Sequence, residues 1–230
     1  MADVGVPAAA AAPSGHAGPR ELQHQFDTME QQRDASSLGM WIFLVTEILF
    51  FGGLFLAYTV YRSQYARAFA EASRHLDITL GTFNTAVLII SSLTMALAVF
   101  SAATGRRRAL VLFLAATMAL GAVFLGVKAV EYTHKFHDHL VPGAHFHFPG
   151  PYGRQAEIFF SLYFAMTGLH AAHMIIGIGI LSVLLRHARR QRYGPDYYTP
   201  VEVSGLYWHF VDIVWIFLFP LLYLIGRHLH

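Results

Sequence analysis

Five long apolar segments alternate with short polar connections along the chain. They lie at residues 37–61, 78–103, 109–131, 157–185 and 201–225. Each matches or exceeds the roughly 20 residues that an α-helix needs to cross the hydrocarbon core of a bilayer. The pattern therefore predicts an all-α integral membrane protein, in which residues 37–230 form a five-transmembrane-helix bundle.

The first 36 residues differ from the rest of the chain. Residues 1–19 are rich in Ala, Pro and Gly, residues 20–34 are polar, and neither part has the leucine-rich core of a signal peptide. We expect residues 1–36 to form a polar, mobile N-terminal tail. Within it, Leu22, Phe26 and Met29 recur at helical spacing, which favours a short surface helix over full disorder.

Basic residues in the connections predict the orientation of the bundle. With the N-terminus inside, nine Lys and Arg residues lie on the inner side and six on the outer side. The inner residues cluster in short connections, at 106–108 and 186–192, where the positive-inside rule applies best. We therefore predict that the N-terminus is inside and the C-terminus outside.

Composition excludes several classes of function. With 55% hydrophobic and only 13% charged residues, the chain is too apolar for a soluble domain of 230 residues. The formal net charge is only +2 and the basic residues are scattered, so no nucleic-acid partner is expected. The absence of cysteine from the sequence excludes disulfides, thiolate metal sites and a cysteine nucleophile.

The last apolar segment contains an ionisable pair, His209 and Asp212. Residues three apart lie on one face of a helix, so each group is expected to offset the desolvation of the other. Trp208 and Trp215 flank the same face. Because charged groups in a membrane usually face protein rather than lipid, the pair predicts packing against other helices that carry polar residues.

Glu47, in the first apolar segment, has no partner within its own helix. A carboxylate on an apolar face needs a hydrogen bond from another helix, so we expect Glu47 to face the histidines of the fourth segment, His170 and His173, or the His209 face of the fifth. We expect no obligatory proton transfer through Glu47. The alternative is a proton-carrying or lipid-contacting carboxylate.

Other positions are expected to hold the bundle together or to contact its surroundings. Lys128 and Glu131 are three apart near the end of the third segment, which predicts a local ion pair near the interface. One face of the second segment carries the small polar residues Asn84 and Ser91, which are typical of helix packing. The residues that we expect to contact lipid or another subunit are Tyr58, Asn84, Trp208 and Trp215.

The residues alone leave three classes of protein open. His-x-x-His at 170–173 and Glu-x-x-His at 131–134 are spacings that a diiron membrane oxygenase uses, but this histidine pair lies in the middle of its segment rather than at a helix end. A transporter is disfavoured because the sequence shows neither paired broken helices nor an internal repeat. The third class, a structural subunit without a cofactor, is favoured.

The connection at 132–155 is predicted to be a loop. It holds five histidines and three prolines. Such a density of histidines permits metal binding, but solvated surface histidines explain the loop better because acidic or cysteine partners at helical spacing are missing. We therefore expect no metal-ligating and no catalytic residue on this chain.

Two motifs connect the sequence to a known family. The stretch Gly-Leu-His-Ala-Ala-His-Met-Ile-Ile-Gly at 168–177 and the stretch Tyr-Trp-His-Phe-Val-Asp-Ile-Val-Trp at 207–215 closely resemble subunit III of the haem-copper oxygen reductases. The stretch Thr-Glu-Ile-Leu-Phe-Phe at 46–51 is similar to that family's segment with a membrane-buried carboxylate. Asn84 and Thr85, with Lys128, Glu131 and Tyr132, resemble its next two helices. The resemblance extends in collinear order over residues 37–225, in the short five-helix form of the family.

The resemblance implies a cofactor-free accessory subunit of a proton-pumping cytochrome c oxidase, in the inner membrane of a bacterium. Its partners would be catalytic subunit I, subunit II and membrane phospholipids, with haem and copper held by the partner subunits. The subunit would support proton uptake and protect the catalytic subunit during reduction of oxygen to water. Alternatives within the superfamily are subunit III of a quinol oxidase and the accessory protein of nitric oxide reductase. The longer form of the family has two further N-terminal helices across a lipid-filled cleft.

Overall fold

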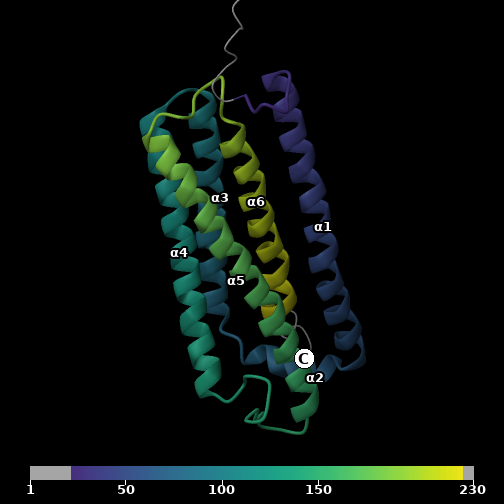
Figure 1. The fold of residues 1–230 in the computed structure, drawn as a ribbon. Helices are drawn as coiled ribbons and strands as arrows, with labels where there is room; N and C mark the ends of the chain where they lie inside the picture. The colour runs from purple at the N-terminus through teal and green to yellow at the C-terminus, as the bar shows by residue number, and fades with distance from the viewer. Residues whose placement is uncertain (1–21, 225–230) are drawn as a thin grey trace, which may run out of the picture.

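The computed structural model describes residues 22–224, and within this range the chain forms helices and no strand. Figure 1 shows the helices as a bundle of long, roughly aligned rods. The elements are α1 (Met29–Gln64), α2 (Ala66–Arg74), α3 (Ile78–Ala103), α4 (Arg107–His137), α5 (Gly153–Arg189), α6 (Thr199–Phe219) and the π-helical turn η1 (Pro220–Leu224). Five helices are long and apolar enough to cross a membrane, namely α1, α3, α4, α5 and α6 with η1. The prediction of an all-α chain with five helices of membrane-spanning length and composition is confirmed for the described residues.

α1 begins earlier than the first apolar segment. The Thr28 side chain caps it by accepting a hydrogen bond from the Gln31 backbone N–H at 3.1 Å. Residues 22–28 form turns and bends, so the separate surface helix expected around Leu22–Met29 is not formed. The polar residues from Met29 onward instead extend the membrane helix, because lengthening an existing helix is more favourable than nucleating a new one. The predicted tail at residues 1–21 lies outside the described residues.

The connections also differ from the expected ones. The polar stretch between the first two spans contains α2, which lies across one end of the bundle (Figure 1). α4 continues to His137 and α5 begins at Gly153, so the His-rich loop is shorter than 132–155, and His134 belongs to a helix. α3 begins at Ile78, where the Asp77 side chain accepts hydrogen bonds from the backbone N–H groups of Thr79 and Leu80.

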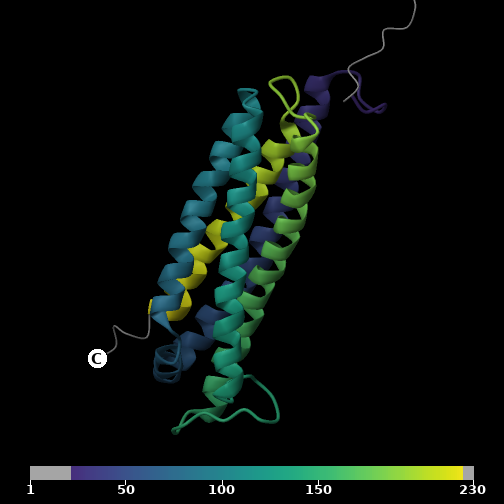
Figure 2. The same ribbon diagram turned by 90° about the vertical axis from the view of Figure 1, so that its left-hand side faces the viewer.

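α6 is the most buried of the five long helices. Figures 1 and 2 show it passing between α3 on one side and α1 and α5 on the other. The predicted packing face of the second span is buried in α3, including Asn84 and Ser91. α1 lies at the edge of the bundle and buries only Leu44, Phe51 and Tyr58. Its remaining apolar surface is therefore available to lipid or to another subunit.

Candidate functional site

A closed polar cluster lies between α4, α5 and η1. Lys128 Nζ donates hydrogen bonds to Glu131 Oε2 at 2.9 Å, Tyr223 Oη at 3.0 Å and Tyr163 Oη at 3.1 Å. Glu131 Oε1 accepts hydrogen bonds from Tyr223 at 2.6 Å and Tyr163 at 2.9 Å. The aromatic rings of Tyr132, Tyr163, Trp215 and Tyr223 lie 5.0–5.7 Å from the ammonium group and stabilise it further.

The predicted ion pair between Lys128 and Glu131 is thus confirmed, and it is buried inside the bundle. The two side chains are only 3% and 2% exposed. Two charges can be this deeply buried because each is paired and hydrogen-bonded on several sides. Tyr223 reaches the pair through η1. Pro220 has no N–H to donate to the carbonyl one turn back, so the helix continues as a π-helical turn there.

Glu47 contacts the fourth span as predicted. Glu47 Oε2 lies 3.1 Å from His173 Nε2, and the other ring nitrogen, Nδ1, lies 2.9 Å from the Leu169 carbonyl oxygen. A carbonyl oxygen only accepts, so Nδ1 carries a hydrogen. The hydrogen bond between His173 Nε2 and Glu47 Oε2 then requires one further proton, which is carried either by Nε2 or by the Glu47 carboxyl group. The two side chains therefore share a proton and together form a neutral unit in the membrane.

His209 and Asp212 do not form the predicted pair. His209 Nδ1 is 2.7 Å from the Ser92 hydroxyl on α3. Asp212 is only 3% exposed and neither carboxylate oxygen has a hydrogen bond with a described residue, although the Ser92 side chain faces it. Both side chains line a cavity of about 420 Å³ between α3 and α6. The shared helix face was predicted correctly, but the imidazole turns to the neighbouring helix.

Four residues predicted to contact lipid or another subunit are buried inside this chain, and that prediction is wrong. Trp208 donates a hydrogen bond to Ser91 at 2.9 Å, Trp215 to Thr85 at 3.1 Å, Tyr58 to the Leu221 carbonyl at 2.7 Å and Asn84 to the Phe124 carbonyl at 3.5 Å. These side chains fill the space around α6, and their N–H and O–H groups donate to adjacent helices, whereas Asn84 Oδ1 has no partner among the described residues.

His170 occupies an apolar part of the core. Its ring lies 5.3 Å from that of Phe124 and 5.2 Å from that of Trp215, and its Nε2 has no hydrogen-bond partner among residues 22–224. In that range no three His, Cys, Asp or Glu side chains gather closely enough to hold a metal ion. Glu131 is bonded to Lys128 and two tyrosines, so the structure does not assemble the ligand set that a diiron oxygenase would require.

Sequence reasoning missed the partners that complete these contacts. Tyr163, Tyr223 and Ser92 are such partners, and each lies on a different helix from the ionisable residue that it contacts. Charge spacing along a single helix therefore gives no signal for them. A search for hydroxyl groups on helices that could face each charge would have included them, although it could not have chosen among them.

Comparison with known proteins agrees with the predicted resemblance. The sequence matches the family described as "Cytochrome c oxidase subunit III" over residues 21–227. It is 35% identical over 202 residues to cytochrome c oxidase subunit 3 of Thermostichus vulcanus, covering 87% of this chain and 92% of that protein. It is 32% identical over 201 residues to quinol oxidase subunit 3 of Bacillus subtilis (strain 168), covering 86% and 92%. Since these matches cover nearly the whole chain, it belongs to the cytochrome c oxidase subunit III family and is a subunit III of the haem-copper oxidases.

Proposed function

We propose that this chain is the cofactor-free accessory subunit III of a proton-pumping cytochrome c oxidase in aerobic respiration, located in a bacterial inner membrane. Haem and copper are held by its partners, catalytic subunit I and subunit II. The family match supports membership of such an oxidoreductase complex. Subunit III assists proton uptake and the stability of the catalytic subunit while oxygen is reduced to water.

The observation that carries this proposal is the way in which the intramembrane ionisable groups are used. Lys128, Glu131, Glu47 and His173 each bond to another helix of the same chain or to each other. A cofactor site would direct such groups toward a common empty space, as His209 and Asp212 are directed toward the cavity between α3 and α6, whereas these four side chains are bonded to one another or to a neighbouring helix. The pattern supports a subunit that is stabilised internally and acts by binding to its partners.

The outer surface supports association with other subunits. α1 exposes large apolar side chains along much of its length, including Trp41, Ile48 and Leu49. Such a surface has to be covered by lipid or by helices of another chain. We propose that part of it faces the catalytic subunit and part faces phospholipid.

A second candidate is subunit III of a quinol oxidase. It is favoured by the relatives named quinol oxidase subunit 3, which are 32% and 31% identical to this chain in two Bacillus species. The relative named cytochrome c oxidase subunit 3 is 35% identical, which supports the first candidate by a small margin. The electron donor is bound by another subunit, so the donor has to be tested on the whole complex.

The test is purification of the complex through an affinity tag on this chain. We expect haem and copper to co-purify and oxygen consumption to be supported by reduced cytochrome c. Oxygen consumption with quinol but not with cytochrome c would favour the second candidate. A complex without haem would overturn both.

A second measurement tests the supporting role. Stripping this subunit from the complex with detergent should leave the initial rate of oxygen reduction nearly unchanged but shorten the time for which turnover continues. Adding the purified subunit back serves as the control and should restore sustained turnover. Equal persistence with and without the subunit would contradict the proposed role.

A further inference from the structure

One face of α6 is left open between α1 and α3. α6 packs against α1, α3 and α5, yet Ile213, Ile216 and Phe217 are between 46% and 62% exposed. A cavity of about 530 Å³ lies between this face and α1, and the cavity of about 420 Å³ that Asp212 lines lies between it and α3. Both cavities are lined by His209 and Ile213. The two cavities therefore adjoin, and together we call them the α6 trough.

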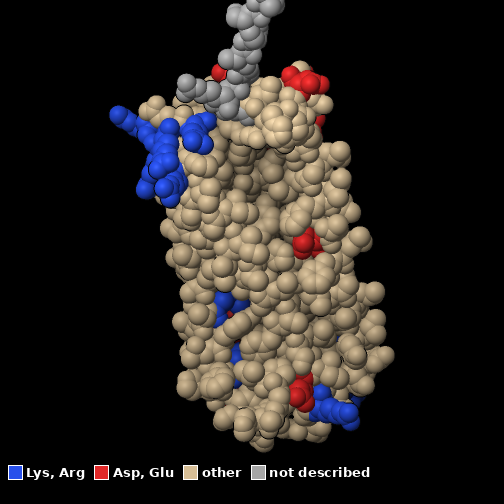
Figure 3. All heavy atoms as spheres, in the orientation of Figure 1, with Lys and Arg blue, Asp and Glu red and all other residues tan. Residues whose placement is uncertain are grey.

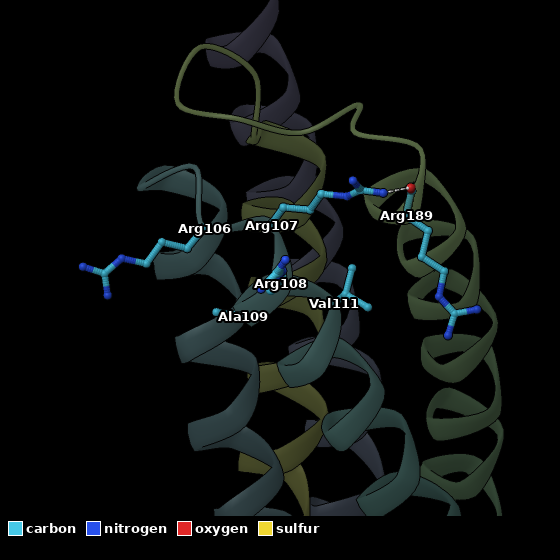
Figure 4. Close-up of a pocket in the computed structure, with 6 residues that line it drawn as sticks. All are labelled: Arg106, Arg107, Arg108, Ala109, Val111 and Arg189. Atoms are coloured by element: carbon cyan, nitrogen blue, oxygen red, sulfur yellow. Dashed lines mark hydrogen bonds between the residues drawn. The ribbon is translucent and has the colours of Figure 1, made fainter.

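The other sides of α6 are closed by helices that are joined to one another. α3 packs along α4, and α4 packs along α5. At the end of the bundle where Lys and Arg gather (Figure 3), Arg107 of α4 donates a hydrogen bond to the backbone carbonyl of Arg189 of α5 (Figure 4). Glu47 of α1 is bonded to His173 of α5. The trough is thus the side from which another molecule in the membrane can reach α6.

The trough has the dimensions of a contact between helices. From Leu206 to Phe217 it follows α6 for about 16 Å, or about three turns, at a rise of about 1.5 Å per residue. Gly52 on the α1 side and Ala96 on the α3 side are small, and small residues allow a second helix to approach closely. The large side chains that form the walls are exposed and apolar, namely Trp41 and Ile48 of α1 and Ile89 and Leu93 of α3.

Asp212 indicates the chemistry that the occupant requires. Asp212 is 3% exposed, and neither of its carboxylate oxygens has a hydrogen-bond partner among residues 22–224. A buried polar group without a hydrogen bond is costly, and within a bilayer no bulk water is present to satisfy it. The acyl chain of a lipid has no donor and would leave the carboxyl group unpaired. A side chain on a second membrane helix supplies a donor, while the backbone of that helix remains hydrogen-bonded within itself.

We propose that the α6 trough binds one transmembrane helix of another subunit, which places a side-chain N–H or O–H donor against the Asp212 carboxyl group. The apolar walls hold this helix by close packing. The hydrogen bond fixes its position along α6, because such a bond is electrostatically stronger where the dielectric constant is low. The inference rests on the proposed function only in requiring a second membrane subunit beside this chain.

The first measurement distinguishes a contact between subunits from a contact inside this chain. Asp212→Leu removes the carboxyl group, and because that group has no hydrogen bond with a described residue, the thermal stability of the purified subunit in detergent should be unchanged or slightly raised. Detergent washing of the complex should release this variant at least about tenfold faster than the wild type, since the donor on the partner helix is left unpaired. The control Asp138→Leu, which removes a carboxyl group at an exposed position, should be released at the wild-type rate.

Two outcomes of this measurement would overturn the proposal. One is equal release of Asp212→Leu and the wild type from the complex. The other is a purified Asp212→Leu subunit that unfolds at a lower temperature than the wild type, because this would assign the carboxyl group to a contact inside the chain.

The second measurement identifies the occupant and leaves Asp212 unchanged. Ile213, which lines both cavities, is replaced by the photo-cross-linker p-benzoylphenylalanine in the complex purified through a tag on this chain. After irradiation, mass spectrometry should identify a cross-link to a membrane-spanning segment of another subunit that contains a donor side chain. Cross-links to lipid alone, or to a second copy of this chain, would overturn the proposal. A complex that contains haem but gives no cross-link to protein would overturn this inference alone, whereas a complex without haem would overturn the proposed function.

Discussion

The ionisable residues in the membrane are stabilised to very different degrees. Lys128 and Glu131 have a complete set of partners, Glu47 has one strong partner in His173, and Asp212 has no hydrogen bond with a described residue. The penalty for an unpaired charge in a medium of low dielectric constant is large. Substitutions at these positions should therefore have graded and distinguishable effects.

The buried ion pair gives the sharpest prediction at this scale. Lys128→Met leaves the Glu131 carboxylate buried without its counter-charge, and the expected loss of stability is about 3–5 kcal/mol. Lys128→Met/Glu131→Leu removes both charges and should be less destabilising than the single variant. Thermal unfolding of the subunit in detergent measures the loss of stability in the single variant and in the double variant. A double variant that is less stable than Lys128→Met would show that the pair is not coupled in this way.

The Glu47–His173 contact predicts a contrast between two substitutions. Glu47→Gln keeps the shape of the side chain and a hydrogen bond to His173, so oxygen reduction and proton pumping in the reconstituted complex should stay nearly intact. Glu47→Leu leaves His173 Nε2 without a partner, at a cost of roughly 1–3 kcal/mol, and should weaken retention of the subunit or its lipid. Loss of pumping in a normally assembled Glu47→Gln complex would identify Glu47 as a proton carrier.

At the scale of the elements, the close approach of three helices depends on glycines that face Trp208. A Cβ atom added to Gly121 of α4 would lie 2.9 Å from the Trp208 ring, and one added to Gly177 of α5 would lie 3.0 Å from it. Trp208 is held in place by its hydrogen bond to Ser91 and cannot move away freely. The indole of α6 therefore fits between α4 and α5 only because both facing positions lack a side chain.

This packing predicts opposite outcomes for neighbouring glycines. Gly121→Ala and Gly177→Ala should each destabilise the bundle by about 1–3 kcal/mol, because the added methyl group overpacks the core. The matched controls Gly126→Ala and Gly179→Ala lie in the same two helices, with no foreign atom within 4 Å of the added Cβ. They should be neutral or slightly stabilising, since alanine favours helix more than glycine does. Thermal unfolding of the four variants measures the change in stability at each position. Equal losses of stability at all four positions would contradict the packing argument.

At the scale of the whole molecule, the arginine-rich ends of α4 and α5 lie at the same end of the bundle as the start of α1 (Figures 1 and 3). Arg33 of α1 also forms an ion pair with Glu202 of α6 at this end, with N–O 3.4 Å. Short basic connections are retained on the cytoplasmic side. We therefore maintain the expectation that this end, and with it the N-terminus, is inside.

The orientation can be measured because the chain has no cysteine of its own. Asp27→Cys places a thiol at the predicted inner end, just before α1, and Asp138→Cys places one at the predicted outer end, after α4; both positions are exposed. A membrane-impermeant maleimide should label Asp138→Cys in intact cells and Asp27→Cys only after the membrane is opened. The reverse pattern would show that the N-terminus is outside.

The sequence by itself determined the number of helices long enough to span a membrane, the face of α3 that is buried, and the ion pair between Lys128 and Glu131. Apolar length and helical period are local properties, and residues three or four apart on a helix are neighbours wherever the helix packs. Family motifs in all five apolar segments added the identity, which the local physics left open.

Only the tertiary structure decided which partner each polar residue has. His209 turned from Asp212 to Ser92, Tyr223 reached Lys128 through η1, and Trp208 entered the core instead of facing lipid. These contacts depend on which helices are adjacent and on how each is rotated about its axis. The adjacency and the rotation of the helices are both set by how side chains from distant parts of the chain pack together. The periodicity of a single helix carries no information about that packing.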